Sequence, residues 1–145
     1  MKEFLRKWWP ILAWATVIAV SSSTYISTKG FVEWMAKWSP WKVTEEQFGE
    51  FWGRWWWVFV KGYHVLEFSV LFLLLVATVR RTRLKALAVL VVSYLGAVGY
   101  AALDEWHQTF VPLRGGRVTD VLIDLSGVTL IAVFLLLRRR RVADP

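Results

Sequence analysis

The chain has 145 residues, which is short enough for a single domain, and 57% of them are hydrophobic, against ~45–50% in a soluble globular domain. This composition argues against a water-soluble protein. The net charge of +7 is concentrated in three short segments, so we predict no nucleic-acid partner. The absence of cysteine excludes disulfides and thiolate sites.

Four apolar segments approach the ~20 residues that a helix needs to cross a hydrocarbon core of ~30 Å. They cover residues 8–26, 56–79, 84–103 and 120–137. Lipid offers the backbone no hydrogen bonds and the alternation of a β-barrel is missing, so we predict an all-α bundle of four transmembrane helices. These helices form one domain over residues 1–145. The first segment could instead be a cleaved signal peptide, but its length and aromatic start favour an intact helix.

The connection between the first two spans is rich in tryptophan, with seven of the 11 tryptophans lying between Trp34 and Trp57. Helical spacing of aromatic residues ends at Ser39 and Pro40, and Thr44 to Gln47 is typical of a capping box that opens a second helix. We therefore predict one or two amphipathic helices lying on the outer leaflet. They anchor the protein, and they could also receive the lipid tail of an amphiphile.

Basic residues gather before the first span, between the second and third, and after the fourth. They are Lys2, Arg6 and Lys7, then Arg80, Arg81, Arg83 and Lys85, then residues 138–141. With four spans these segments fall on one side of the membrane, which the positive-inside rule makes cytoplasmic. We predict a multi-pass protein with both termini in the cytoplasm.

Polar residues recur near the outer ends of three spans, although an ionised carboxylate costs ~2.5–3.5 kcal/mol at mid-membrane. They follow helical spacing in each: Lys61, His64 and Glu67 in the second span, Asp104, His107 and Gln108 in the third, Asp120 and Asp124 in the fourth. Such groups normally face the interior of a bundle and are paired. Small residues below Asp104, such as Ser93 and Gly96, allow close helix contact.

The sequence PLRGG between the last two spans suits a shaped loop. Gly115 and Gly116 can adopt positive φ and expose backbone N–H groups to an anion. Ordinary turns use glycine pairs as well.

These charges could pair with one another in a network that only fixes helix register. Because apolar residues hold a bundle as well as buried ion pairs do, a function is the better reason for so many charges. We predict that they form a ligand-binding site. Its candidate residues are Lys61, His64, Glu67, Asp104, Glu105, His107, Gln108, Arg114, Arg117, Asp120 and Asp124.

The stretches KGYHVLEF and DEWHQTFVPLRGGRVTDVLIDLSG resemble the two signature regions of the VanZ-like family, which are small four-helix bacterial membrane proteins. The match covers Lys61, His64, Glu67, Asp104, Glu105, His107, Gln108, Phe110, Pro112, Arg114, Asp120, Asp124 and Gly127. Ser21 to Ser23 also resemble the family pattern. Three positions depart from it: Leu113 stands where the family usually has glycine, Phe68 replaces a common tyrosine, and Arg117 occupies a position that is often small or polar.

The resemblance implies a protein of the bacterial cell membrane that lowers susceptibility to teicoplanin-like glycopeptides, which carry a lipid tail. We predict that it binds such a glycopeptide or a lipid-linked cell-wall precursor. Arginine suits the carboxylate or phosphate of this ligand. We predict no cofactor, and the sequence leaves the oligomeric state open.

The alternative is a membrane enzyme acting on a lipid-linked or cell-wall substrate. His64, Glu67, Asp104 and His107 are its candidate catalytic residues, since histidines oriented by carboxylates can act as general acids or bases. The same four residues could instead hold a zinc ion, although we predict no metal. An ion or proton pathway is a further option, weakened by the lack of charge in the cytoplasmic halves of the spans.

Overall fold

The computed structural model describes residues 2–25, 27–40 and 43–143, and the side chains among them from residue 6 to residue 138. In this part of the chain five α-helices occur and no strand. They are α1 (Lys2–Ser23), α2 (Thr28–Trp38), α3 (Glu45–Val79), α4 (Ala86–Gln108) and α5 (Val118–Ala143). The all-α prediction is confirmed.

Three of these helices are long and apolar enough to cross a membrane: α3, α4, and α5 over Val118–Arg138. A fourth span results only if α1 and α2 count together as one, and this pair is bent by 107° between Ser23 and Thr28. The protein is therefore a multi-pass membrane protein by the length and composition of its helices, while the four-span topology stays a prediction. The predicted first span extends to Ile26, which lies outside the described residues, whereas α1 ends at Ser23.

The capping box at the start of α3 is confirmed, since Thr44 and Gln47 exchange side-chain and backbone hydrogen bonds of 3.3 Å. The helix that it opens does not end before the predicted span. It continues for 35 residues to Val79, a length of about 52 Å that exceeds the hydrocarbon core. Of the one or two amphipathic helices that were predicted, only α2 is a separate helix. The helix that opens at Thr44 runs on into the predicted span, where the sequence has no proline to end it.

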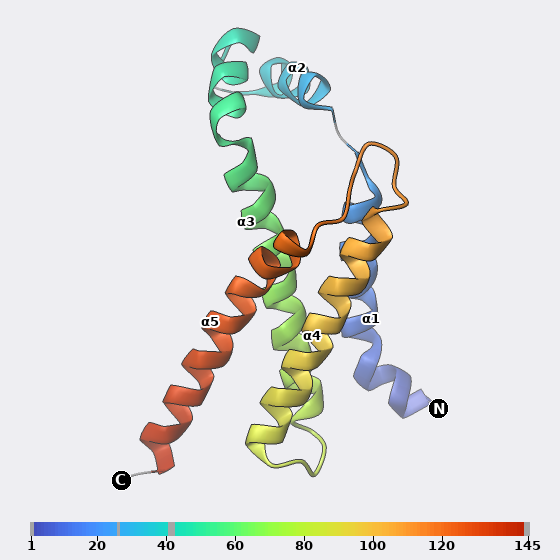
Figure 1. Ribbon diagram of the computed structural model, residues 1–145, viewed down its shortest axis with the longest axis vertical. Helices are drawn as coiled ribbons and strands as arrows, with labels where there is room; N and C mark the ends of the chain where they lie inside the picture. The colour runs from blue at the N-terminus through green and yellow to red at the C-terminus, as the bar shows by residue number, and fades with distance from the viewer. Residues whose placement is uncertain (1, 26, 41–42, 144–145) are drawn as a thin grey trace.

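Helix α2 packs against the first turns of α3 through aromatic rings. The ring of Phe31 lies 4.4 Å from that of Trp52 and 5.9 Å from that of Phe48, measured between centroids. The outer surface of this unit exposes Trp34, Trp38 and Trp57, which are 57%, 67% and 55% accessible. We call α2 and residues 45–59 of α3 the aromatic arm. It projects beyond the rest of the bundle (Figure 1).

Helices α3, α4 and α5 pack against one another, and α1 packs against α3 and α4. The fully buried side chains of the core come from all four helices: Ile18 from α1, Phe68 and Phe72 from α3, Ala97 and Ala101 from α4, and Val128 from α5. Gly127 permits the close approach of α5 to α3, because a Cβ atom there would overlap Ser69 Oγ.

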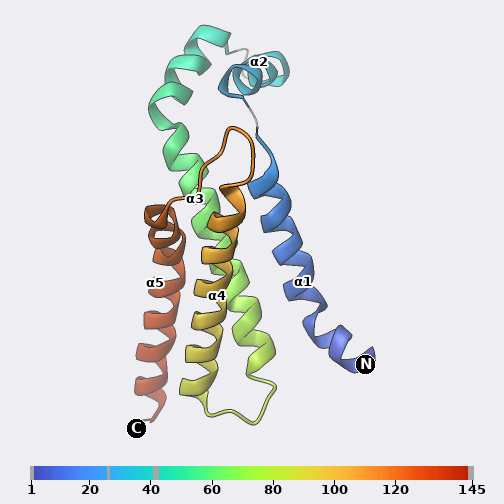
Figure 2. The ribbon, with the colours of Figure 1, turned by 45° about the vertical axis from the view of Figure 1, so that its right-hand side comes forward.

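The two ends of the bundle differ in the charged and polar residues that they carry. The first residues of α1, the α3–α4 connection and the last residues of α5 lie at one end (Figures 1 and 2). These are the segments that hold most of the basic residues. The end of α1, the end of α4 and the start of α5 lie at the other end, below the aromatic arm. The polar residues of the spans gather at this second end, next to the loop that carries Arg114 and Arg117. We call this group the polar cluster: Lys61, His64, Glu67, Asp104, Glu105, His107, Gln108, Arg114, Arg117, Asp120 and Asp124.

Candidate functional site

Three successive serines at the end of α1, the serine triplet, each contact a different polar side chain of a neighbouring helix. The contacts join Ser21 Oγ to Glu67 Oε1 at 2.8 Å, Ser22 Oγ to Asp104 Oδ2 at 2.8 Å, and Ser23 Oγ to His107 Nε2 at 3.0 Å. Consecutive residues of an α-helix point about 100° apart, so three of them reach partners on two adjacent helices. The serine triplet therefore ties α1 to both α3 and α4.

Two further hydrogen bonds fix α1 deeper in the bundle. The indole N–H of Trp14 donates to the backbone carbonyl of Glu67 at 2.9 Å, and the Tyr100 hydroxyl donates to the carbonyl of Ala15 at 2.6 Å. Both donors are aromatic side chains whose rings pack in the apolar core while the polar atom finds a backbone partner. The position of Glu67 is thus set through its side chain and its main chain.

Asp104 is a buried carboxylate near the end of α4 that accepts two hydrogen bonds. Its Oδ2 atom accepts hydrogen bonds from Ser22 Oγ and from Gln108 Nε2, the second at 2.9 Å. Asp104 and Gln108 are 4% and 7% exposed, whereas His107 lies on the exposed flank of the helix. Two members of the predicted polar face therefore enter the protein interior, and His107 stands at its edge.

Glu105 closes the loop between α4 and α5. Its Oε2 atom accepts a 2.8 Å hydrogen bond from the backbone N–H of Arg117, and its Oε1 atom accepts one of 3.3 Å from Gln108 Nε2. Gly116 lies directly against this turn, because a Cβ atom there would overlap the carbonyl oxygen of Glu105. Glu105 thus holds the start of α5 onto the end of α4.

The glycine pair of this loop does not adopt the conformation that its sequence suggests. Neither Gly115 nor Gly116 has a positive φ, and Leu113 has φ of 65° instead. The positive φ that the sequence allowed at these two glycines is therefore absent. Glycine is required at residue 116 for space against Glu105, and the left-handed conformation falls one residue before Arg114.

Arg114 connects the loop to the end of α1. Its Nη2 atom donates a 2.7 Å hydrogen bond to the backbone carbonyl of Thr24, immediately after the serine triplet. The backbone N–H of Arg114 bonds to Val111 O at 3.1 Å, which closes the turn. Figure 2 shows the loop rising beside the end of α1.

Ion pairing at this end is incomplete. Lys61 Nζ lies 2.5 Å from Asp120 Oδ2, and His64 Nδ1 lies 3.4 Å from Glu67 Oε2 without hydrogen-bond geometry. The third ion pair of the described chain joins Lys29 and Glu33 on α2.

Neither Arg114 nor Arg117 lies within ion-pair distance of a carboxylate among residues 2–25, 27–40 and 43–143. Mutual pairing of all the charges, the purely structural alternative, is therefore not what the folded chain adopts.

Several buried polar atoms of the site have no hydrogen-bond partner in the described part of the protein. They are both carboxylate oxygens of Asp124, Glu67 Oε2, His64 Nδ1 and, lower on α4, Ser93 Oγ. Asp124 is only 1% exposed, and Glu67 is equally buried. Leaving a buried polar atom without a hydrogen-bond partner lowers the stability of a fold by about 1–3 kcal/mol. We call the hydrogen bonds that these atoms could still form their unused bonding capacity.

No group of three or more His, Asp or Glu side chains is gathered closely enough to hold a metal ion anywhere in the residues that the structure describes. Of the set weighed for zinc, Glu67, Asp104 and His107 each contact a different serine of the triplet, and His64 lies against Glu67. These side chains do not converge on one point.

The family model described as VanZ/LLP1 matches residues 7–139, which is nearly the whole chain. The chain belongs to the VanZ/LLP1 family. No curated protein and no solved structure matches it. The resemblance seen in KGYHVLEF and in the longer second stretch is thus confirmed at the level of the family. Family membership and the apolar helices together fit a membrane protein linked to antibiotic resistance.

The candidate residues inferred from the sequence omit the donors that organise this VanZ/LLP1 site. Ser21, Ser22 and Ser23 belong to the family resemblance but were not among the candidates, and neither were Trp14 and Tyr100. Three adjacent hydroxyls that end an apolar helix were the available sequence signal. Their partners depend on how α1 packs, which spacing along one helix does not reveal.

Proposed function

We propose that this protein binds an amphiphilic glycopeptide of the teicoplanin type, or a lipid-linked cell-wall precursor, and thereby lowers the susceptibility of a bacterium to the antibiotic. The observation that carries the proposal is the unused bonding capacity of Asp124 and Glu67, together with two arginines of the α4–α5 loop that have no carboxylate partner within the described chain. The cluster offers acceptors and donors that the folded chain does not use itself.

The proposal includes a topology, with residues 1–145 as one domain of the bacterial cell membrane. Four spans would place the basic end of the bundle and both termini in the cytoplasm. The polar end then faces the outer leaflet, where a glycopeptide and the growing cell wall meet the membrane. The proposed ligand-binding residues are Lys61, His64, Glu67, Asp104, Glu105, His107, Gln108, Arg114, Arg117, Asp120 and Asp124.

The ligand needs polar and apolar parts because the site has both. Arg114 and Arg117 can each hold a carboxylate or phosphate through two parallel hydrogen bonds. The exposed rings of the aromatic arm, among them Trp34 and Trp57, offer a surface for a lipid tail at the membrane interface. A small polar molecule would leave this arm unused.

The proposal is tested by replacing Arg114 in a susceptible host that expresses the protein. We expect Arg114→Ala to return the inhibitory concentration of a lipid-tailed glycopeptide to that of the host without the protein. Arg138→Ala is the matched control, because Arg138 is an exposed arginine late in α5, away from both the polar cluster and the aromatic arm. Both variants must reach the membrane at wild-type level. Unchanged protection with Arg114→Ala would contradict the proposal.

Catalysis is the second candidate function, and the contact between His64 and Glu67 favours it. Both side chains are buried, their facing atoms lie 3.4 Å apart, and neither atom has another partner within the described chain. A histidine oriented by a carboxylate can move a proton during hydrolysis or group transfer. Incubation of purified protein with lipid-linked precursor tests this second function. A product that the wild type forms and His64→Gln does not would support an enzyme. Absence of product from the wild type would eliminate catalysis of this substrate.

A further inference from the structure

Asp124 is a carboxylate that the fold buries without giving it a positive partner. Both of its oxygens lack a hydrogen-bond partner within the described chain, and only 1% of the residue is exposed. Carboxylates inside a membrane bundle are normally paired. Lys61 acts on Asp124 electrostatically, but its ammonium group is already paired with Asp120. Asp124 therefore still has the capacity to bind a positive group from outside the chain.

The charges around Asp124 are mostly negative. Asp104 and Glu105 of α4 and Asp120 of α5 all act on it electrostatically. Over the whole polar cluster, five carboxylates stand against three basic side chains, an excess of two negative charges when both histidines are neutral. A ligand with only anionic groups would increase this excess, whereas a cationic group would reduce it.

The approach to Asp124 is from the polar end of the bundle. About one turn deeper on α5, Gly127 packs so closely against α3 that a Cβ atom there would overlap Ser69 Oγ. One turn toward the polar end, Asp120 and Lys61 form their ion pair, and both side chains are partly exposed. A group from outside therefore reaches Asp124 past this ion pair and not through the lower part of the bundle.

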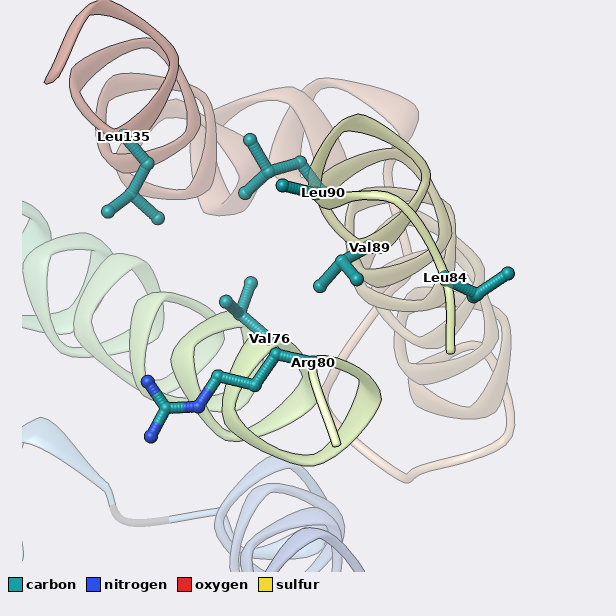
Figure 3. Close-up of a pocket in the computed structure, with 7 residues that line it drawn as sticks. Val76, Arg80, Leu84, Val89, Leu90 and Leu135 are labelled. Carbon is teal, nitrogen blue, oxygen red and sulfur yellow. The ribbon is translucent and has the colours of Figure 1, made fainter. Parts of the chain in front are cut away.

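The opposite, basic end of the bundle offers no comparable partner for a cationic group. A cleft of about 330 Å³ opens there between α3, α4 and α5, and its lining is apolar apart from Arg80. The Arg80 side chain points away from Leu90 and Leu135 of the cleft (Figure 3). None of the side chains that line this cleft is a hydrogen-bond acceptor.

We propose that Asp124 binds a primary ammonium group of the ligand, an inference that rests on the proposed function and names the chemistry of the group bound there. An ammonium group is compact and carries three N–H donors, so it can serve both oxygens of one carboxylate. A neutral amide or hydroxyl would supply a hydrogen bond but leave the charge of Asp124 unpaired. With its anionic group held by Arg114 and Arg117, the ligand is zwitterionic.

Binding of two lipid-tailed glycopeptides that differ at a single primary amine tests the proposal. The amine is free in the first probe and acetylated in the second, and each fluorescent probe is titrated with the full chain in lipid nanodiscs. We expect the wild type to bind the acetylated probe about tenfold more weakly, because acetylation removes the positive charge. We expect Asp124→Asn, which keeps the shape of the side chain without its charge, to bind both probes equally.

Asp104→Asn is the matched control, because Asp104 is a similarly buried carboxylate that has partners within the protein. Whatever its overall affinity, we expect this variant to retain the difference between the two probes. Equal affinities of the wild type for both probes, or an undiminished difference in Asp124→Asn, would overturn the ammonium site and leave the proposed binding function standing. No saturable binding of either probe by the wild type would overturn both.

A free sodium ion is the other cation that a buried carboxylate can attract. Thermal unfolding without glycopeptide, in sodium chloride and in N-methylglucamine chloride, distinguishes this source from the ligand. We expect the change of salt to shift the melting temperatures of the wild type and of Asp124→Asn equally. Stabilisation by sodium that the wild type shows and Asp124→Asn lacks would assign the site to a free ion and overturn the proposal.

Discussion

The two flanks of the polar cluster differ in how many hydrogen bonds their buried carboxylates accept. On the α1 flank, Glu67 and Asp104 each accept a hydrogen bond from a serine of the triplet, and Asp104 also accepts one from Gln108. On the α5 flank, Asp124 is just as buried, yet neither of its oxygens has a partner within the described chain. The first flank uses its carboxylates to hold helices together, although the second oxygen of Glu67, Oε2, has no partner within the described chain. The second keeps bonding capacity that the fold does not need, and this is where a ligand can act.

The largest predicted effect separates Asp124 from Asp104. Asp124→Leu removes a buried polar group without a partner, so we expect the protein to become more stable by about 1–3 kcal/mol while protection against the glycopeptide is lost. Asp104→Leu leaves the buried Ser22 hydroxyl without its acceptor and Gln108 with only its longer bond to Glu105, and we expect a destabilisation of similar size. Unfolding of the two purified variants in mixed detergent micelles measures both. The same sign of change for the two variants would contradict the difference between the flanks.

The next effect concerns the loop that joins the flanks. Gly116→Ala forces a Cβ atom onto the Glu105 carbonyl oxygen, and we expect a loss of about 1–3 kcal/mol, typical of overpacking. The neighbouring Gly115→Ala is the matched control, because a Cβ atom there meets nothing within 4 Å and φ is not positive. Equal thermal stability of these two variants in detergent would show that the loop does not pack on α4 as described.

A smaller effect is expected from the serine triplet. Ser22→Ala removes one of two donors to Asp104, and we expect a loss of about 1 kcal/mol because Gln108 still satisfies that oxygen. Thr16→Ala provides the control, since the Thr16 hydroxyl is exposed and bonds only within α1 to the carbonyl of Leu12. The midpoint of unfolding by denaturing detergent compares them. A wild-type midpoint for Ser22→Ala would mean that this bond does not hold α1.

The smallest effect is expected at Leu113. A left-handed conformation costs a residue other than glycine about 1–2 kcal/mol, and glycine recovers part of this while losing roughly 0.5–1 kcal/mol in entropy. We therefore expect Leu113→Gly to change stability by less than about 1 kcal/mol, in the stabilising direction. Its melting temperature, compared with that of Leu113→Ala, provides the measurement. A clear destabilisation by glycine would mean that the Leu113 side chain, which is exposed, makes a contact in the native loop.

The sequence predicted features that arise from local physics. Composition and apolar length indicated a helical membrane protein, and the capping box at Thr44 marked the start of a helix correctly. The continuity of that helix was not predicted, because the tryptophan-rich connection and the second span, from residue 56, differ in composition. In the structure the continuous helix α3 runs across this boundary.

The contacts of the candidate site depend on packing that the sequence does not specify. Spacing placed Asp120 and Asp124 on one face of a helix, but Asp120 pairs with Lys61 while Asp124 stays unpartnered within the described chain. The serine triplet acquires its partners only when α1 lies between α3 and α4. The positive φ falls at Leu113 rather than at a glycine, and spacing along the chain does not reveal that Gly116 is needed for space against Glu105 instead.

The most direct test of a ligand site at Asp124 is equilibrium binding of a fluorescent lipid-tailed glycopeptide to the protein in lipid nanodiscs. We predict saturable binding by the wild type and by Arg138→Ala. We predict an affinity at least about tenfold lower for Asp124→Leu, because a charge-assisted hydrogen bond contributes ~1.4 kcal/mol or more to binding. A glycopeptide without the tail should bind more weakly to all of them. Equal binding by the wild type and the folded Asp124→Leu variant, or no saturable binding above empty nanodiscs, would contradict the account.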